Sequence, residues 1–153
     1  MARNDVHVAA TPERVFEVLR DPACYPRWVV GAKRFRSADP GFPAPGTRFH
    51  HAVGLGPFEI KDHTQVLEFD APRWVKLRAR ARPIGTAIVT LEVRPEGDGS
   101  HIAMYEAPGD PLSRLAFNTL TDPLVRRRND ESLRRLKALV ERPPPQRTAA
   151  AAS

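Results

Sequence analysis

The stretch that carries the clearest fold signal is VHVAATPERVFEVLRDPACYPRW, residues 6–28. Val6 and Val8 alternate with polar residues, and this period of two predicts a short strand. Thr11 follows and precedes a proline, an order typical of a helix start, because the hydroxyl caps the helix and proline suits its first position. Apolar residues then recur at helical spacing as far as Asp21. We therefore expect a strand, a helix that ends near Asp21, and one more short helical turn.

Downstream, residues 47–106 contain strand-like stretches separated by short turn signals, which predicts a meander of antiparallel strands. The apolar residues of the second stretch change parity between Ile60 and Leu67, which indicates a bulge. Alternation assigns two faces to the later strands. The expected inward set is Val75, Leu77, Ala79, Val89, Leu91, Ile102 and Met104, whereas Lys76, Arg78 and Arg80 are expected to face solvent.

Residues 112–141 have apolar side chains at helical spacing and are interrupted only by Pro123. At 1.5 Å per residue this stretch would form a helix of about 45 Å. A proline inside a helix lacks the N–H group and clashes with the preceding turn, so we expect one long helix bent at Pro123. Residues 1–142 then form a single domain, and the proline- and alanine-rich tail at 143–153 is expected to be disordered.

Composition excludes several classes of protein. A chain of 153 residues suits one domain, and no apolar run approaches the roughly 18 residues of a membrane span. No apolar leader follows the first residues, so we expect a cytoplasmic protein. Cys24 is the only cysteine, which excludes an intrachain disulfide and a thiolate-clustered metal site.

The formal net charge is +6, and twenty of the 24 basic residues are arginine. Two arginine clusters stand out, one at residues 126–128 and one that recurs at every second position from Arg78 to Arg82. Each cluster adjoins an apolar face that must pack, so we interpret both as solvated surfaces. We expect no nucleic-acid partner.

The opening stretch, from Val6 to Trp28, is similar almost residue type by residue type to the START-like helix-grip superfamily (SRPBCC), in its bacterial polyketide cyclase/dehydrase branch. Weaker matches occur at residues 70–73, 97–100 and 133–137, and the resemblance covers residues 4–142. It implies an α+β fold, with a curved antiparallel sheet of about seven strands around a long C-terminal helix and two short helices after the first strand. It also implies an apolar cavity for a small hydrophobic ligand, but no particular reaction.

We expect that cavity between the inner sheet face and the long helix. Small residues at apolar positions, Ala79, Ala81, Ala87 and Ala116, should leave space there. The expected apolar wall is Phe49, Val53, Phe58, Leu77, Val89, Leu91, Met104 and Leu115. The expected polar contacts to a ligand are His51, Glu106, Asn118 and Asp122.

Three of these polar residues are also catalytic candidates, namely His51, Glu106 and Asp122. Each shares a face with apolar residues, where burial can move a pKa toward neutrality. A histidine and a carboxylate could then cyclise or dehydrate a polyketide-like substrate. The other hypothesis, which we favour, is a binding module whose ligand is a lipid, an aromatic or a polyketide-like molecule.

No metal or other cofactor is expected. His50 and His51 are adjacent and in a strand point to opposite faces, so they cannot bind one ion together. The sequence leaves the oligomeric state open between monomer and homodimer.

Overall fold

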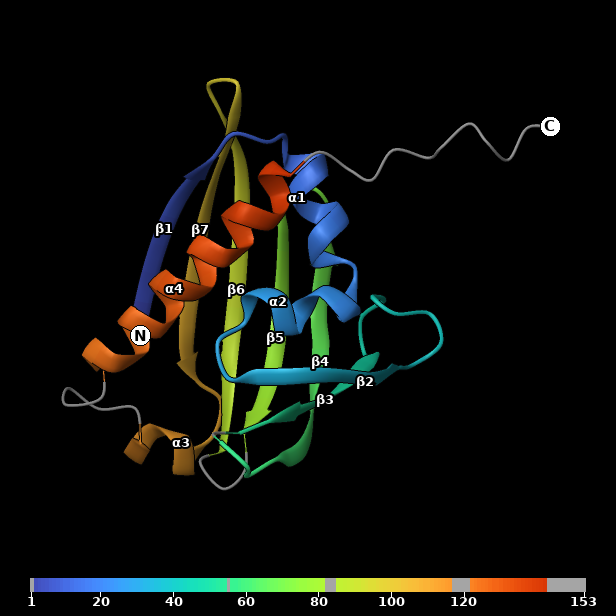
Figure 1. The fold of residues 1–153 in the computed structure, drawn as a ribbon, viewed down its shortest axis with the longest axis vertical. Helices are drawn as coiled ribbons and strands as arrows, with labels where there is room; N and C mark the ends of the chain where they lie inside the picture. Colours follow the sequence, from blue (N-terminus) through green and yellow to red (C-terminus); the bar gives the residue numbers. More distant parts are fainter. Residues whose placement is uncertain (1, 55, 82–84, 117–121, 143–153) are drawn as a thin grey trace.

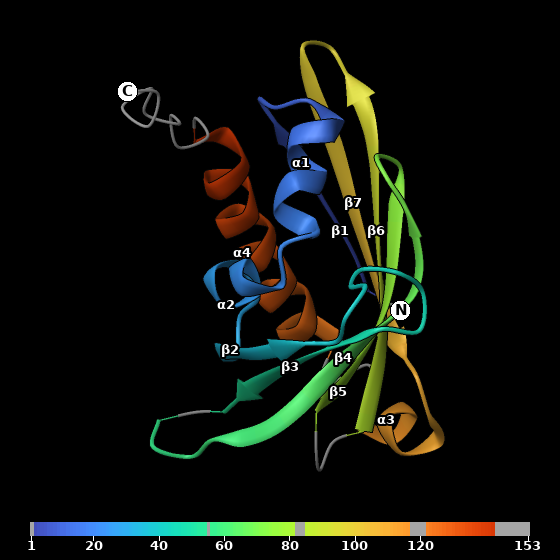
Figure 2. The ribbon, with the colours of Figure 1, turned by 90° about the vertical axis from the view of Figure 1, so that its right-hand side faces the viewer.

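The computed structural model describes residues 2–54, 56–81, 85–116 and 122–142. These residues form a seven-stranded antiparallel sheet with helices against one of its faces, here called the inner face (Figures 1 and 2). The expected α+β helix-grip fold is therefore confirmed. The elements in chain order are β1 (Ala2–Val8), α1 (Pro12–Leu19), η1 (Pro22–Cys24), α2 (Tyr25–Trp28), β2 (Ala32–Ala38), β3 (Arg48–Val53), β4 (Ile60–Asp70), β5 (Trp74–Ala81), β6 (Gly85–Glu96), β7 (Gly99–Pro108), α3 (Pro111–Ala116) and α4 (Asp122–Glu141).

The sheet order is β1-β7-β6-β5-β4-β3-β2, so β1 joins the meander by pairing with β7. Figure 1 shows α4 running diagonally across β1, β7 and β6, with α1 and α2 beside it. Figure 2 shows these three helices on one side of a curved sheet. None of the described helices is both long enough and apolar enough to cross a bilayer.

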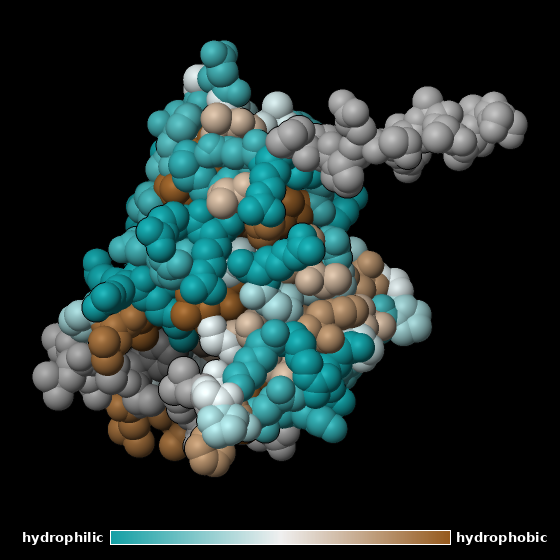
Figure 3. All heavy atoms as spheres, viewed as in Figure 1, coloured by the Kyte–Doolittle hydropathy of each residue, from teal (hydrophilic) through white to brown (hydrophobic). Residues whose placement is uncertain are grey.

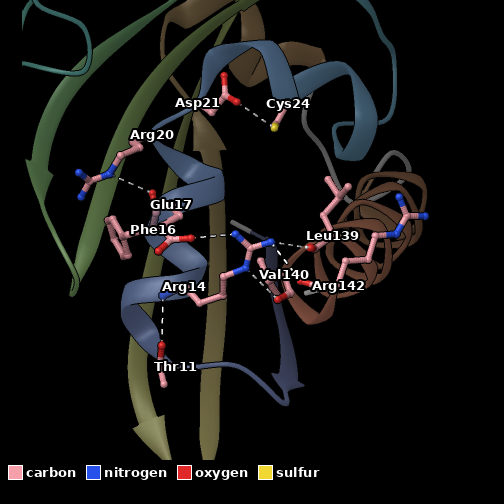
Figure 4. A network of polar contacts seen from close by, with 10 residues as sticks. All are labelled: Thr11, Arg14, Phe16, Glu17, Arg20, Asp21, Cys24, Leu139, Val140 and Arg142. Atoms are coloured by element: carbon pink, nitrogen blue, oxygen red, sulfur yellow. Dashed lines mark hydrogen bonds and ion pairs between the residues drawn. The ribbon is translucent and has the colours of Figure 1, made fainter. Parts of the chain in front are cut away.

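The first helix begins where the sequence predicted. The Arg14 backbone N–H donates to Thr11 Oγ1 at 3.2 Å, which caps α1 as predicted. The Arg14 guanidinium reaches the far end of α4 and donates to the carbonyl oxygens of Leu139, Val140 and Arg142 at 3.2–3.4 Å (Figure 4). The last carbonyls of a helix have no partner within it, so Arg14 satisfies them and joins α1 to α4.

The inner face of the sheet follows the predicted alternation. Val75, Leu77, Leu91, Ile102 and Met104 are buried, while Ala79 and Val89 are partly buried. The predicted bulge occurs in β4, where the register with β5 shifts between Val66 and Glu68. The parity of the inward residues changes there, and Phe69 beyond the bulge packs edge-on against Phe16 of α1.

The predicted single helix over residues 112–141 is wrong. The chain forms two helices, and Figure 1 shows α3 below the end of the sheet, away from the axis of α4. Pro123 is the second residue of α4 and causes no bend in a longer helix. The N–H groups of a first helical turn have no partner within the helix, so a proline there removes no hydrogen bond.

Replacement of this proline tests the corrected assignment. Because Pro123 already occupies a favourable position, we expect Pro123→Ala to change the free energy of unfolding by less than about 1 kcal/mol. Urea denaturation of the two proteins measures the difference. A proline inside a helix costs about 3 kcal/mol, so a gain of that size in the variant would contradict the assignment.

The three basic residues expected to face solvent do so at least in part. Arg78 is exposed and Lys76 and Arg80 are partly exposed, and Arg80 also donates from Nε to Oδ1 of Asp62, whose side chain is fully buried. A buried carboxylate needs a partner, and the long arginine side chain supplies one while remaining partly in solvent.

Candidate functional site

The most distinctive part of the inner face is a histidine among aromatic rings. His51 of β3 is only 6% exposed, and its ring centroid lies 5.3 Å from that of Phe49, two residues earlier on the same face. Phe49 contacts Tyr25 of α2 at 4.4 Å and Phe42 at 5.6 Å between centroids. Tyr25 in turn contacts Trp28 at 5.1 Å. Phe49 therefore joins the imidazole to an aromatic cluster from β3, α2 and the loop that carries Phe42.

The His51 imidazole uses one of its two nitrogens within the protein. Nε2 lies 2.9 Å from Thr64 Oγ1, whereas Nδ1 is buried and has no hydrogen-bond partner in the protein. Burial lowers the pKa of His51 to about 4, although the nearby charge of Asp62 acts in the opposite direction. The ring is therefore neutral at pH 7, and Nδ1 remains available for one further hydrogen bond.

Asp62 supplies the negative charge beside this histidine. It is the cross-strand partner of His51, and its side chain is fully buried. Oδ1 accepts from Arg80 Nε and from the backbone N–H of His63, the latter at 3.0 Å. The charge of this carboxylate is thus balanced by an arginine from β5.

A second polar cluster joins β7, which lies near the other edge of the sheet, to α4. Arg128 Nη2 contacts both carboxylate oxygens of buried Glu106, and Asn129 Nδ2 donates to Oε2 at 2.8 Å. Both oxygens of the carboxylate are therefore already occupied. This geometry makes Glu106 an anchor between β7 and α4.

The structure does not bring together His51 and Glu106, two of the three expected catalytic residues. His51 lies on β3 and Glu106 on β7, which are four inter-strand steps apart in the sheet. At about 4.8 Å per step, they are roughly 19 Å apart along the sheet. At one level of the strands between them the inward side chains are small, since Ala79 pairs with both Ala87 and Thr64.

The expected wall residues differ in burial. Phe49, Leu77, Leu91 and Met104 are buried, and Val53 and Val89 are partly buried. Phe58 is 78% and Leu115 76% exposed, so neither is buried on the inner face as expected. β4 begins only at Ile60, which leaves Phe58 in the preceding turn, and Leu115 belongs to α3 instead of α4.

The last two expected polar contacts to a ligand are Asp122 and Asn118. Asp122 is the first residue of α4 and accepts from Arg126 Nε at 2.9 Å, one helical turn along the same helix. Asp122 is therefore an acidic residue in the first turn of α4 that pairs with an arginine of the next turn. Asn118 lies outside the described residues.

Sequence reasoning missed five residues that shape the two clusters. Thr64 shares the parity of Val66, so alternation along β4 could have identified it as inward-facing. The other four depend on tertiary packing that no local pattern reports. They are Trp28, whose buried Nε1 has no protein partner, and Arg128, Asn129 and Arg80.

A hollow of about 450 Å³ lies on the exposed side of α4, lined by Arg127, Asp130, Glu131 and Arg134. Figure 3 shows this face as mostly hydrophilic. The hollow lies on the side of α4 that faces away from the sheet. The expected cavity between the sheet and α4 stays a prediction. Within the described ranges, no three His, Cys, Asp or Glu side chains group in a way that could hold a metal ion.

Comparison with known proteins gives one family and a set of similar folds. A family model described as "Polyketide cyclase / dehydrase and lipid transport" matches residues 2–141, and no curated protein matches the chain. The Mesorhizobium loti protein MLL2253 superposes with a TM-score of 0.69 at 17% identity, over 94% of this chain and 98% of that one. The Chromobacterium violaceum protein CV1439 gives 0.68 at 20% identity, over 93% and 98%.

A third similar structure is StfQ, a di-domain ARO/CYC protein from the steffimycin biosynthetic pathway. It superposes with a TM-score of 0.69 at 11% identity, and the match covers 92% of this chain and 50% of that one. At these identities the likeness of all three structures shows the shared fold alone.

Proposed function

Since this chain belongs to the polyketide cyclase/dehydrase and lipid transport family, we propose that it binds a small, mostly apolar molecule between the inner sheet face and α4. The observation that carries the proposal is the buried Nδ1 of His51, which has no partner in the protein. Buried polar atoms are nearly always hydrogen-bonded, and an unpaired one costs about 1–3 kcal/mol. A polar atom of the ligand would remove that cost, and the rings beside His51 would hold its apolar body.

The geometry favours binding over catalysis. An efficient general base has a pKa near the working pH, whereas burial holds the pKa of His51 at about 4 and makes it a weak base. Glu106 has both oxygens engaged by Arg128 and Asn129. Neither residue is therefore arranged as a strong proton acceptor.

A cyclase or dehydratase is the second candidate function, and one observation supports it. His51 is unprotonated at pH 7 and so retains a lone pair for a proton. The two functions differ in their response to His51→Phe, an apolar replacement of similar shape. A binding module keeps its apolar ligand in this variant, whereas an enzyme that uses His51 loses turnover of a bound substrate.

Uptake of a neutral fluorescent probe, N-phenylnaphthylamine, tests the proposed cavity. We expect saturable binding to the wild-type protein and at least a tenfold weaker affinity in Ala87→Phe, because the new ring would fill the space beside Ala79. Ala107→Phe is the matched control, since Ala107 is the neighbour of Ile88 on the other face of the sheet. Absence of saturable binding, or an equal loss in both variants, would contradict the proposal.

The proposed unit is one domain over residues 1–142 that works in the cytoplasm as a monomer or homodimer. The family match over residues 2–141 supports this domain extent. Native mass spectrometry of protein purified from its own host would give the mass of a retained ligand and the number of chains together.

A further inference from the structure

We infer that the ligand is electrically neutral and that its hydroxyl or carbonyl oxygen hydrogen-bonds to Nδ1 of His51. The inference rests on the proposed function and narrows its ligand class. It excludes carboxylic acids, such as free fatty acids, as the main occupant. Three features of the described residues carry it: the buried charges, the contacts of His51 and the absence of a buried cation.

The buried charges on the inner face are negative and already balanced. Apart from Tyr25, whose phenol is kept neutral by burial, the buried ionisable residues of the described ranges are His51, Asp62 and Glu106, and they include no lysine or arginine. The arginines that reach the carboxylates, Arg80 and Arg128, stay partly in solvent and are engaged by those partners. An anionic ligand at His51 would therefore lie beside the buried carboxylate of Asp62 with no uncommitted buried cation among the described residues, and an unpaired buried charge is strongly unfavourable.

The imidazole itself does not favour an anion. A carboxylate accepts hydrogen bonds without donating one, so it would bind best to a protonated His51. Burial holds the pKa of His51 at about 4, which makes protonation at pH 7 unfavourable by a factor on the order of a thousand. Asp62 alone does not reverse this effect of burial, although its charge raises the pKa.

A neutral oxygen fits the imidazole in its unprotonated state. If Thr64 donates to Nε2, then Nδ1 carries the proton and donates to either a carbonyl or a hydroxyl oxygen. If Nε2 instead donates to Thr64, then Nδ1 accepts from a hydroxyl. A hydroxyl therefore satisfies both tautomers, and a carbonyl satisfies one.

Four small naphthalenes with substituents at the same ring carbon separate charge from hydrogen bonding. They are naphthoate, naphthyl methyl ketone, the corresponding naphthyl ethanol and ethylnaphthalene. Each is smaller than N-phenylnaphthylamine, so each fits wherever that probe binds. Displacement of the probe at neutral pH, at two salt concentrations, gives their relative affinities.

We expect the alcohol to bind at least tenfold more tightly than naphthoate. It should bind about fivefold more tightly than ethylnaphthalene, which is the affinity ratio that corresponds to the net free energy of one hydrogen bond. The ketone equals the alcohol if Nδ1 carries the proton. In His51→Phe the advantage of the alcohol over ethylnaphthalene should disappear while the probe still binds. His50→Phe, which changes the adjacent histidine on the opposite face, should keep that advantage.

The outcomes distinguish this inference from the proposed function. If the probe does not bind, the proposed function and this inference both fail. If the probe binds but naphthoate equals or exceeds the alcohol, the inference is overturned and the binding function stands. The same holds if His51→Phe leaves the advantage of the alcohol unchanged.

Discussion

Between pH 6.5 and about pH 4, His51 alone is expected to remove on the order of 3 kcal/mol from the free energy of unfolding. Burial lowers the pKa of His51 in the folded protein to about 4 from the ordinary value of 6.5. In this window the unfolded chain binds a proton that the folded protein does not, so acid favours unfolding. The contribution of His51 to stability is complete above pH 6.5 and is lost as the pH falls through the window.

Urea denaturation of the wild-type protein and His51→Phe over this pH range measures the effect. The variant should lose about 3 kcal/mol less than the wild type on acidification. Burial also lowers the pKa of His63, but that residue is present in both proteins, so their difference isolates His51. His50→Phe is the control and should retain the wild-type loss. Parallel curves for wild type and His51→Phe would refute a depressed pKa at this position.

Arg128→Met is expected to destabilise the protein by about 3 kcal/mol, because it leaves the buried carboxylate of Glu106 with Asn129 as its remaining partner in this cluster. Loss of one partner from a buried ion pair costs about 3–5 kcal/mol. The Arg128 side chain is 41% exposed, so solvent screening places the cost at the lower end. Methionine keeps much of the apolar stem, which limits the loss of packing.

A second substitution separates the charge effect from packing. Glu106→Gln removes the buried charge, so the Arg128→Met/Glu106→Gln double variant should regain most of the stability that Arg128→Met loses. Arg127→Met changes the exposed neighbouring arginine and should shift stability by no more than about 0.5 kcal/mol. Equal losses in Arg128→Met and Arg127→Met would show that the ion pair contributes little.

Local patterns predicted most of the fold, because caps and periodicity are properties of adjacent residues. Thr11 and the proline after it marked the start of α1, and the alternation from Val75 to Leu77 identified the inner face of β5. The same reasoning failed at Pro123. Helical spacing exists on both sides of this proline, and spacing alone cannot distinguish one bent helix from two helices with different axes.

The candidate site was only partly predictable from the sequence. Parity placed His51 correctly on the inner face, where it is buried beside Phe49 of the same strand. The engagement of Glu106 by Arg128 joins a strand to a helix 22 residues later, so only the tertiary packing reveals it. The wide separation of His51 and Glu106 likewise depends on the order of strands in the sheet, which parity does not specify.

The pairing of β1 with β7 also determines when the sheet can form during protein synthesis. The paired residues of these strands are roughly 100 residues apart in the chain. A ribosome adds about 5–20 residues per second, so β1 waits on the order of 5–20 s for its partner strand. The helix that packs on β1, α4, is synthesised later still. The nascent chain therefore presents an unpaired strand with Val6 and Val8 on one face for many seconds, during which molecular chaperones have access to it.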